Sequence, residues 1–126
     1  MRYAEKMSEN ILITLSDTYV APRFDLTTEV FLTSLGEDGS TGNSKTIVLA
    51  HESADDLCQF ILNEEVNIVV CGAIEEEFFD YLTWKKVHVL DSIIGTWERA
   101  LEYLISGRLQ AGMILLDRTE RVNHVK

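Results

Sequence analysis

The sequence predicts an α/β fold with a mixed five-stranded sheet, made of an antiparallel hairpin and three parallel strands. Residues 66–72 form a short run rich in β-branched residues that ends at a glycine and precedes a helical pattern, which is typical of a buried parallel strand. Helical and strand-like patterns alternate over residues 54–107, which favours right-handed crossovers between parallel strands. The densest turn signal, residues 36–42, separates two strand-like runs and indicates a hairpin.

Composition favours one domain spanning residues 1–126, with a core at about residues 10–107 and a tail of undecided structure at 108–126. A chain of 126 residues with 46% hydrophobic content is long enough to bury an ordinary core, and a single proline with few glycines leaves no linker. The 11 Lys and Arg against 21 Asp and Glu give a net charge of −10. Because this charge repels phosphate, we expect no nucleic-acid partner.

The cysteines and the N-terminal residues indicate a cytoplasmic protein. Cys58 and Cys71 are far apart and form no CxxC, so neither a disulfide framework nor a zinc site is predicted, and reduced thiols are expected. Residues 1–10 are polar, and the apolar run 11–15 is too short for a signal peptide or a membrane span. We therefore expect no membrane association.

The first half of the chain predicts three strands. Residues 10–15 are nearly continuously apolar, as in a central strand, and residues 16–18 end them with turn-forming side chains. A loop is expected at residues 20–25, where Pro22 cannot donate to a ladder. Residues 29–35 and 46–50 form the two arms of the hairpin.

The first two helices have clear starting signals. Ser53 is an N-cap for a helix that begins at Ala54 and fades at residues 63–65. After the buried strand, a second helix is expected over about residues 74–84, with Glu75–Glu77 as a solvated first turn that complements the helix dipole.

A third strand–helix pair completes the pattern. Residues 87–90 form a short buried strand, and Thr96 caps a last helix that Gly107 stops. Trp84 and Trp97 fit helix ends and core packing. The apolar residues 113–116 of the tail are compatible with a strand, a docked helical turn or a frayed end.

The predicted topology places the site at one edge of the sheet. Residues 16–17, 71–72 and 91–92 follow the three parallel strands, and the loop 20–25 leaves the same edge. Open α/β sheets bind ligands outside the carboxyl ends of their strands. We therefore expect a binding cleft there.

Several short motifs resemble one known family. Residues 20–24 (Val-Ala-Pro-Arg-Phe), 69–74 (Val-Val-Cys-Gly-Ala-Ile), 87–90 (Val-His-Val-Leu) and 95–101 (Gly-Thr-Trp-Glu-Arg-Ala-Leu) together resemble the dinitrogenase iron–molybdenum cofactor-binding family, which includes nitrogenase cofactor carriers. The resemblance covers residues 10–107. It implies a ribonuclease-H-like three-layer fold and a role in holding or delivering a metal–sulfur cofactor.

This chain departs from the family pattern at two positions. Members often have a histidine after the proline of the first loop, where this chain has Arg23, and this removes an expected metal ligand. Members often have paired glycines at the middle turn, where this chain has Cys71-Gly72, and this adds a thiol.

Cys71 and Arg23 are the side chains expected to hold a cofactor. A cysteine between a strand end and a helix start has a lowered pKa and can ligate iron as thiolate, whereas the alternative is a buried cysteine that fills the strand end. Arg23 can clamp an anion with its planar fork, or pair with Asp25 or Asp17 at the surface.

The pocket is completed by Phe24 and two glycines. Gly72 and Gly95 each precede a helix, where backbone N–H groups can bind an anion without a side-chain charge. The alternative for both glycines is that they permit tight turns.

These residues lead to one main functional hypothesis. We expect a non-catalytic protein, not an enzyme, that binds an iron–molybdenum or other iron–sulfur-type cluster, with Cys71 as metal ligand, and that meets an acceptor or donor protein. The protein can equally be isolated without the cluster. The expected pocket residues are Arg23, Phe24, Cys71, Gly72 and Gly95.

Two alternatives remain open at this point. Asp17 and Asp91 at neighbouring strand ends are a carboxylate pair for a metal-dependent hydrolase or nuclease. A scaffold that self-associates through the hairpin edge strand or residues 113–116 is the third hypothesis.

Overall fold

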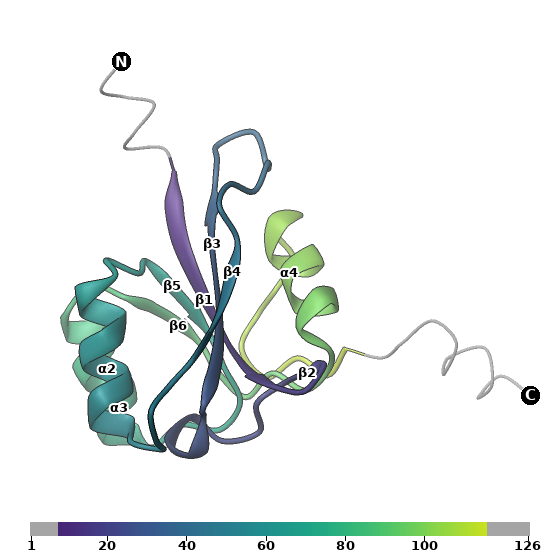
Figure 1. Ribbon diagram of the computed structural model, residues 1–126. Coiled ribbons are helices and arrows are strands. Elements are labelled where there is room, and N and C mark those ends of the chain that lie inside the picture. The colour runs from purple at the N-terminus through teal and green to yellow at the C-terminus, as the bar shows by residue number, and fades with distance from the viewer. Residues whose placement is uncertain (1–7, 116–126) are drawn as a thin grey trace, which may run out of the picture.

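The computed structural model describes residues 8–115, which form a six-stranded mixed sheet flanked by helices on both faces (Figure 1). The main path of the sheet has the order β4-β3-β1-β5-β6, and β2 pairs with β1 beside this path. The strands are β1 (Glu9–Ser16), β2 (Tyr19–Val20), β3 (Glu29–Leu35), β4 (Lys45–Val48), β5 (Ile68–Val70) and β6 (His88–Leu90).

The predicted hairpin and the three parallel strands are confirmed. Strand β1 is central: Leu12 pairs with Leu32 of the antiparallel β3 and with Val69 of the parallel β5, and Val69 in turn pairs with Val89 of β6. Strand β2 lies where a loop was predicted to begin. It forms because Leu15 pairs with Val20 across a tight turn.

Three helices and one short 3-10 helix connect the strands. They are η1 (Phe24–Leu26), α2 (Ala54–Asn63), α3 (Glu76–Trp84) and α4 (Trp97–Ile105). Helices α2 and α3 cover one face of the sheet and α4 covers the other, so the described residues form three layers (Figure 1). None of these helices combines the length and apolar character needed to cross a membrane.

Both predicted N-caps are confirmed. The amide of Asp56 donates to Oγ of Ser53 at 3.1 Å, and the amide of Arg99 donates to Oγ1 of Thr96 at 3.3 Å. Each bond satisfies a donor that the first helical turn leaves without an intrahelical partner. The starts of α2 and α4 are therefore set by local sequence.

Two hydrophobic cores lie on the two faces of the sheet, because the side chains of each strand alternate between faces. The core under α2 and α3 contains Leu12, Val30, Val69 and the helix residues Leu57 and Leu82. The core under α4 contains a different set: Ile11, Ile13, Val70, Leu90, Ile93 and Ala100.

The described part of the tail runs beside the segment that precedes α4. Ile94 and Ile114 form an isolated parallel bridge, and the amide of Leu115 donates to the carbonyl of Ile94 at 2.7 Å. Of the open alternatives, an extended segment is the one the structure shows up to Leu115. Leu116 lies outside the described residues.

Candidate functional site

The loop after β2 is fastened across the carboxyl edge of the parallel strands. The amide of Ala21 donates to the carbonyl of Thr14 at 2.9 Å. The amide of Ala73 donates to the carbonyl of Pro22, and the amide of Phe24 donates to the carbonyl of Ala73, both at 2.8 Å. The loop therefore covers the residues that follow β5.

Gly72 permits this close approach of two backbones. A Cβ on Gly72 would overlap the carbonyl oxygens of Ala21 and Pro22. Helix α3 begins only at Glu76, with Glu75 as N-cap, so Gly72 is not at the helix start that the sequence predicted. Gly72 therefore does not contribute its N–H group to the helix N-terminus, which contradicts the predicted anion site, and the tight backbone approach is the alternative that the structure shows.

Gly95 directly precedes the N-cap of α4, as expected, but it lies between two other segments. Its carbonyl accepts from the amide of Val20 at 2.9 Å, and a Cβ on it would lie 2.8 Å from the carbonyl oxygen of Leu115. Its φ of +148° is one that glycine adopts readily. The tight packing explains why a glycine is needed at this position, and no bound ligand is required to account for it.

Cys71 is fully buried and contacts the core under α2 and α3. Burial raises the pKa of the thiol, and the nearby carboxylate of Asp91 raises it further. Of the two alternatives that the sequence left open, the structure shows the buried cysteine that fills the strand end, and the accessible thiolate with a lowered pKa is contradicted. The thiol faces hydrocarbon because the loop and η1 pack over the end of β5.

Phe24 is also a core residue. Its exposed fraction is 1%, and its ring centroid lies 6.4 Å from that of Phe78 on α3. The prediction that Phe24 lines an open pocket is therefore wrong. Its aromatic ring anchors η1 beneath the helices.

Arg23 is exposed and pairs with Asp25, which is one of the two alternatives that the sequence left open. Its Nε lies 3.1 Å from Oδ1 and its Nη2 lies 2.6 Å from Oδ2 of Asp25, a bidentate arrangement. This pairing holds the pKa of Asp25 below its usual value and raises the pKa of Arg23, with a further contribution from Glu75. The guanidinium therefore has carboxylate neighbours.

A cavity of about 380 Å³, which we call the Arg23 cavity, opens beside this loop. Its walls come from the end of β1, the loop and the start of β3: Leu15, Ser16, Asp17, Ala21, Pro22, Arg23, Leu26, Thr28 and Glu29. Of the residues singled out from the sequence, Arg23 and Asp17 line this cavity. Phe24, Cys71, Gly72, Gly95 and Asp91 do not.

Sequence reasoning missed the wall that β3 contributes. Leu15 pairs with Glu29 because β3 runs antiparallel to β1, and this pairing brings Thr28 and Glu29 to the cavity. The predicted order of strand and hairpin contained this information, since the second strand of an antiparallel pair begins where the first one ends.

No metal-binding cluster is found in residues 8–115. No group of three or more His, Cys, Asp or Glu side chains in this part of the chain is placed to hold a metal ion. The Asp91 carboxylate accepts a hydrogen bond from its neighbour Ser92 at 3.1 Å, and Asp17 lies in the Arg23 cavity instead. The described residues therefore offer a guanidinium and carboxylates but no thiolate cage.

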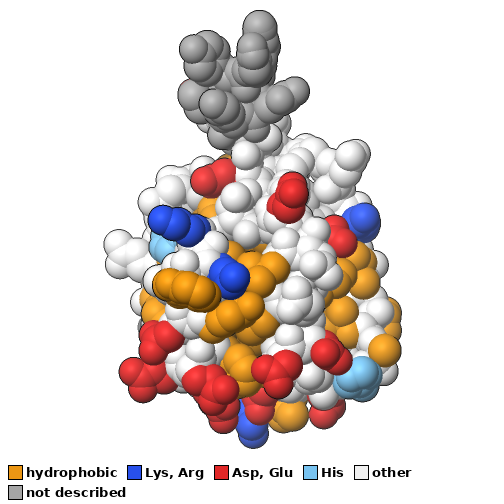
Figure 2. All heavy atoms as spheres, turned by 90° about the vertical axis from the view of Figure 1, so that its left-hand side faces the viewer, with side chains coloured by type: hydrophobic (Ala, Val, Ile, Leu, Met, Phe, Trp, Pro, Cys, Tyr) orange, Lys and Arg blue, Asp and Glu red, His pale blue; other side chains and the backbone are white. Residues whose placement is uncertain are grey.

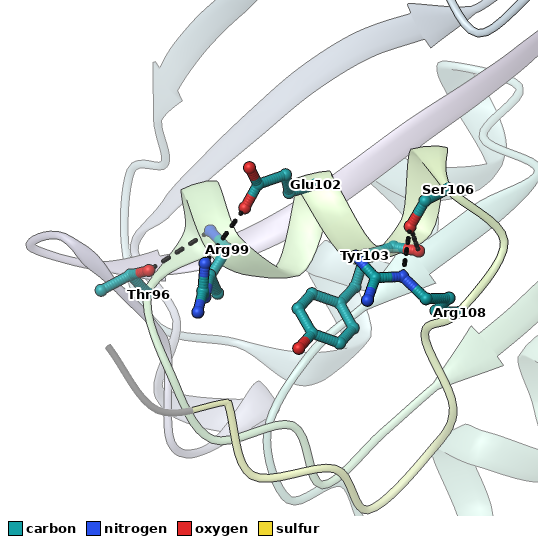
Figure 3. A network of polar contacts seen from close by, with 6 residues as sticks. All are labelled: Thr96, Arg99, Glu102, Tyr103, Ser106 and Arg108. Carbon is teal, nitrogen blue, oxygen red and sulfur yellow. Dashed lines mark hydrogen bonds and ion pairs between the residues drawn. The ribbon is translucent and has the colours of Figure 1, made fainter. Parts of the chain in front are cut away.

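A larger cavity, of about 610 Å³, lies along α4 on the other face of the sheet. Figure 3 shows a network of polar contacts along this helix, from Thr96 before it to Arg108 after it. Arg99 pairs with Glu102 at 3.5 Å, and the Arg108 guanidinium lies 4.3 Å from the Tyr103 ring centroid. Nε of Arg108 also donates to Ser106 at 2.9 Å, so this network ties the last helix to the segment that follows it.

Comparison with known proteins finds chains of similar structure. No protein-family model matches the chain, and no curated protein matches it. A “putative dinitrogenase” from Methanocaldococcus jannaschii has a TM-score of 0.67 at 18% identity, over 82% of this chain and 93% of that one. A “putative NifB protein” from Thermotoga has a TM-score of 0.61 at 19% identity, over 87% of this chain and 98% of that one.

A third similar structure is the apo form of the orange protein from Desulfovibrio gigas. Its TM-score is 0.63 at 14% identity, over 86% of this chain and 97% of that one. At such identities the likeness shows a shared fold. The described α/β fold therefore matches these proteins over most of their length.

Proposed function

We propose that this chain is a cytoplasmic member of the dinitrogenase iron–molybdenum cofactor-binding family, with its ribonuclease-H-like fold, and that it is a non-catalytic carrier of an anionic metal–sulfur cluster. The observation that carries the proposal is the fold likeness, over more than four-fifths of the chain, to proteins named “putative dinitrogenase”, “putative NifB protein” and orange protein. The carrier would exchange its cargo with an acceptor or donor protein.

The Arg23 cavity is the site we propose for this cargo. Its volume of about 380 Å³ lies within the range of about 300–1,000 Å³ of small-molecule sites, and it lies at the carboxyl edge of β1. Because the thiol of Cys71 is buried, the residues do not fit a cluster built on protein thiolates. Arg23 would hold a preformed anion by charge and hydrogen bonds, against the repulsion of Asp17 and Glu29, which also line the cavity.

Asp25 competes with this anion for Arg23. The bidentate pair occupies the Nε–Nη2 edge of the guanidinium, which is one of the two edges that it can offer to a ligand. An exposed pair of this kind contributes little stability, so an anion can displace the carboxylate at small cost. Removing the Asp25 charge should therefore strengthen binding, and removing the Arg23 charge should weaken it.

The proposal can be tested with tetrathiomolybdate, a preformed anion of molybdenum and sulfur. Its binding to the protein is measured by anaerobic equilibrium dialysis and by visible absorption. We expect Arg23→Gln to weaken binding about fivefold or more, and Asp25→Asn to strengthen it. Arg108→Gln, which removes the same charge at a distant exposed site, is the matched control and should change little. Cys71→Ala should retain binding.

Two results would contradict the proposed site. Equal losses in Arg23→Gln and Arg108→Gln would mean that the anion responds to overall charge only. A loss confined to Cys71→Ala would mean that the core opens and the thiol is the ligand, as the sequence first suggested. Anaerobic loading with ferrous iron and sulfide, followed by metal analysis, extends the test to iron–sulfur cargo.

A further inference from the structure

A groove with an apolar floor lies between α2 and α3, on the face of the molecule that Figure 2 shows. Its volume is about 320 Å³. Its lining residues come from both helices: Asp55, Cys58, Gln59, Glu77, Phe78 and Tyr81. We call it the α2–α3 groove.

The apolar surface continues from the groove to the end of α3. Tyr81 lines the groove, and Trp84, one turn further along the helix, is 73% exposed. Nζ of Lys85 lies 4.9 Å from the Trp84 ring centroid and 5.7 Å from that of Tyr81, so both rings contact one side chain. Trp84 ends α3 as expected, but its exposure contradicts the expectation that it packs in the core. Contiguous exposed aromatic surface of this kind marks an interaction site.

Carboxylates border this surface on one side. Asp55 and Glu77 line the groove itself, and Asp56 and Glu76 lie beside them in the first turns of the two helices. Figure 2 shows a band of acidic side chains below the apolar patch. A basic partner would neutralise these carboxylates, whereas a second copy of this chain would bring a further net charge of −10 to the surface.

The arrangement of the two helices indicates the shape of the partner. Helices α2 and α3 both run antiparallel to β5, since α2 leads into that strand and α3 leads out of it toward the parallel β6. They therefore lie side by side in the same direction, and the furrow between two such helices accepts the ridge of a third. An amphipathic helix presents its apolar residues as such a ridge.

We propose that the α2–α3 groove and Trp84 dock a basic amphipathic helix of a partner protein. Its apolar stripe lies over Phe78, Tyr81 and Trp84, and its Lys and Arg side chains face Asp55 and Glu77. The proposal does not depend on the cargo or on the Arg23 cavity, because Arg23 is not among the groove's lining residues.

The probe is an 18-residue helical peptide of Leu and Lys, with leucines at i, i+3, i+4 and i+7 spacing. The control is the same peptide with every Lys replaced by Glu. Calorimetry should give micromolar binding for the Lys peptide, weakened at least tenfold in 0.5 M NaCl, and no binding for the Glu peptide. The indole N–H resonance of Trp84, assigned with Trp84→Phe, should shift on binding, while that of Trp97 should not.

Variants locate the surface. Asp55→Lys combined with Glu77→Lys should weaken binding at least tenfold, and Trp84→Ala at least fivefold. Glu37→Lys combined with Glu98→Lys makes the same change in net charge at exposed positions outside the groove, and should bind within twofold of the original protein. Circular dichroism verifies that each variant is folded.

Three outcomes would overturn the proposal. Equal losses in the two double variants would make the binding a response to net charge. Equal affinity for the Glu peptide would mean that the carboxylates do not select the partner. A dimer in sedimentation that Trp84→Ala dissociates would mean that a second copy, not a basic helix, covers this surface.

Discussion

At the scale of single residues, Thr14 is a buried polar group that the fold leaves without compensation. Its side chain is fully buried, and Oγ1 has no hydrogen-bond partner within the described residues. Leu12 pairs with Val69 in β5, so the parallel register places Thr14 beside Cys71 on the same face of the sheet. Thr27, also buried, differs because its Oγ1 donates to the carbonyl of Arg23 at 3.0 Å.

These two threonines give opposite predictions for the same substitution. Thr14→Val replaces an uncompensated hydroxyl by a methyl group of the same shape, and should stabilise the protein by about 1 kcal/mol. Thr27→Val removes a hydrogen bond and leaves a carbonyl with one partner fewer, and should destabilise it by about 1 kcal/mol. Urea unfolding of both variants measures the difference. Destabilisation by Thr14→Val would mean that its hydroxyl is paired in solution.

At the scale of elements, the contact between the end of β5 and the loop after β2 decides the local structure. The apolar run 66–72 has strand character throughout, yet only Ile68–Val70 are in β5. The run leaves the sheet because residue 73 exchanges hydrogen bonds with Pro22 and Phe24. This contact needs a residue without a side chain at position 72.

Gly72→Ala should therefore be severely destabilising, by about 3 kcal/mol, because the added methyl meets two backbone carbonyls that cannot move independently. Gly107→Ala is the matched control. Gly107 has a φ of +76° but open space around it, so only the left-handed backbone is strained, at about 1 kcal/mol. Thermal or urea unfolding compares the two. If Gly72→Ala lowered the free energy of unfolding by no more than Gly107→Ala does, the loop would be able to withdraw from β5.

At the scale of the whole molecule, charge is distributed unevenly over a well-packed sheet. The chain carries a net charge of −10, and the first turns of α2 and α3 place carboxylates close together at one end of the molecule. Repulsion of this kind opposes the compact state. Salt weakens it, since the Debye length falls from about 30 Å at 0.01 M to about 10 Å at 0.1 M.

We therefore expect the melting temperature to rise when NaCl is increased from 10 to 200 mM at neutral pH. KCl should give the same increase, because the effect depends on ionic strength and not on a bound ion. Differential scanning calorimetry measures both series. A melting temperature that falls with salt would mean that attractive ion pairs, such as Arg23 with Asp25, outweigh the repulsion.

The order of the longer strands and helices, and the starts of two helices, could be predicted from the residues alone, whereas β2 and η1 could not. Apolar runs, turn residues and the caps Ser53 and Thr96 act within a few residues of the chain, so their effect can be read from the residues alone. The pairing of Arg23 with Asp25 belongs here too, as a contact over two positions that the sequence offered as an alternative.

Which of these residues are accessible depends on packing between segments that are distant in the chain. Cys71 and Phe24 are buried because a loop 50 positions before the cysteine packs over the strand end, and Trp84 is exposed because no described segment covers that end of α3. The Arg23 cavity and the α2–α3 groove likewise join residues that are distant in the chain. Burial, and with it the pKa of a thiol, depends on what packs against a residue, and local sequence does not contain that information.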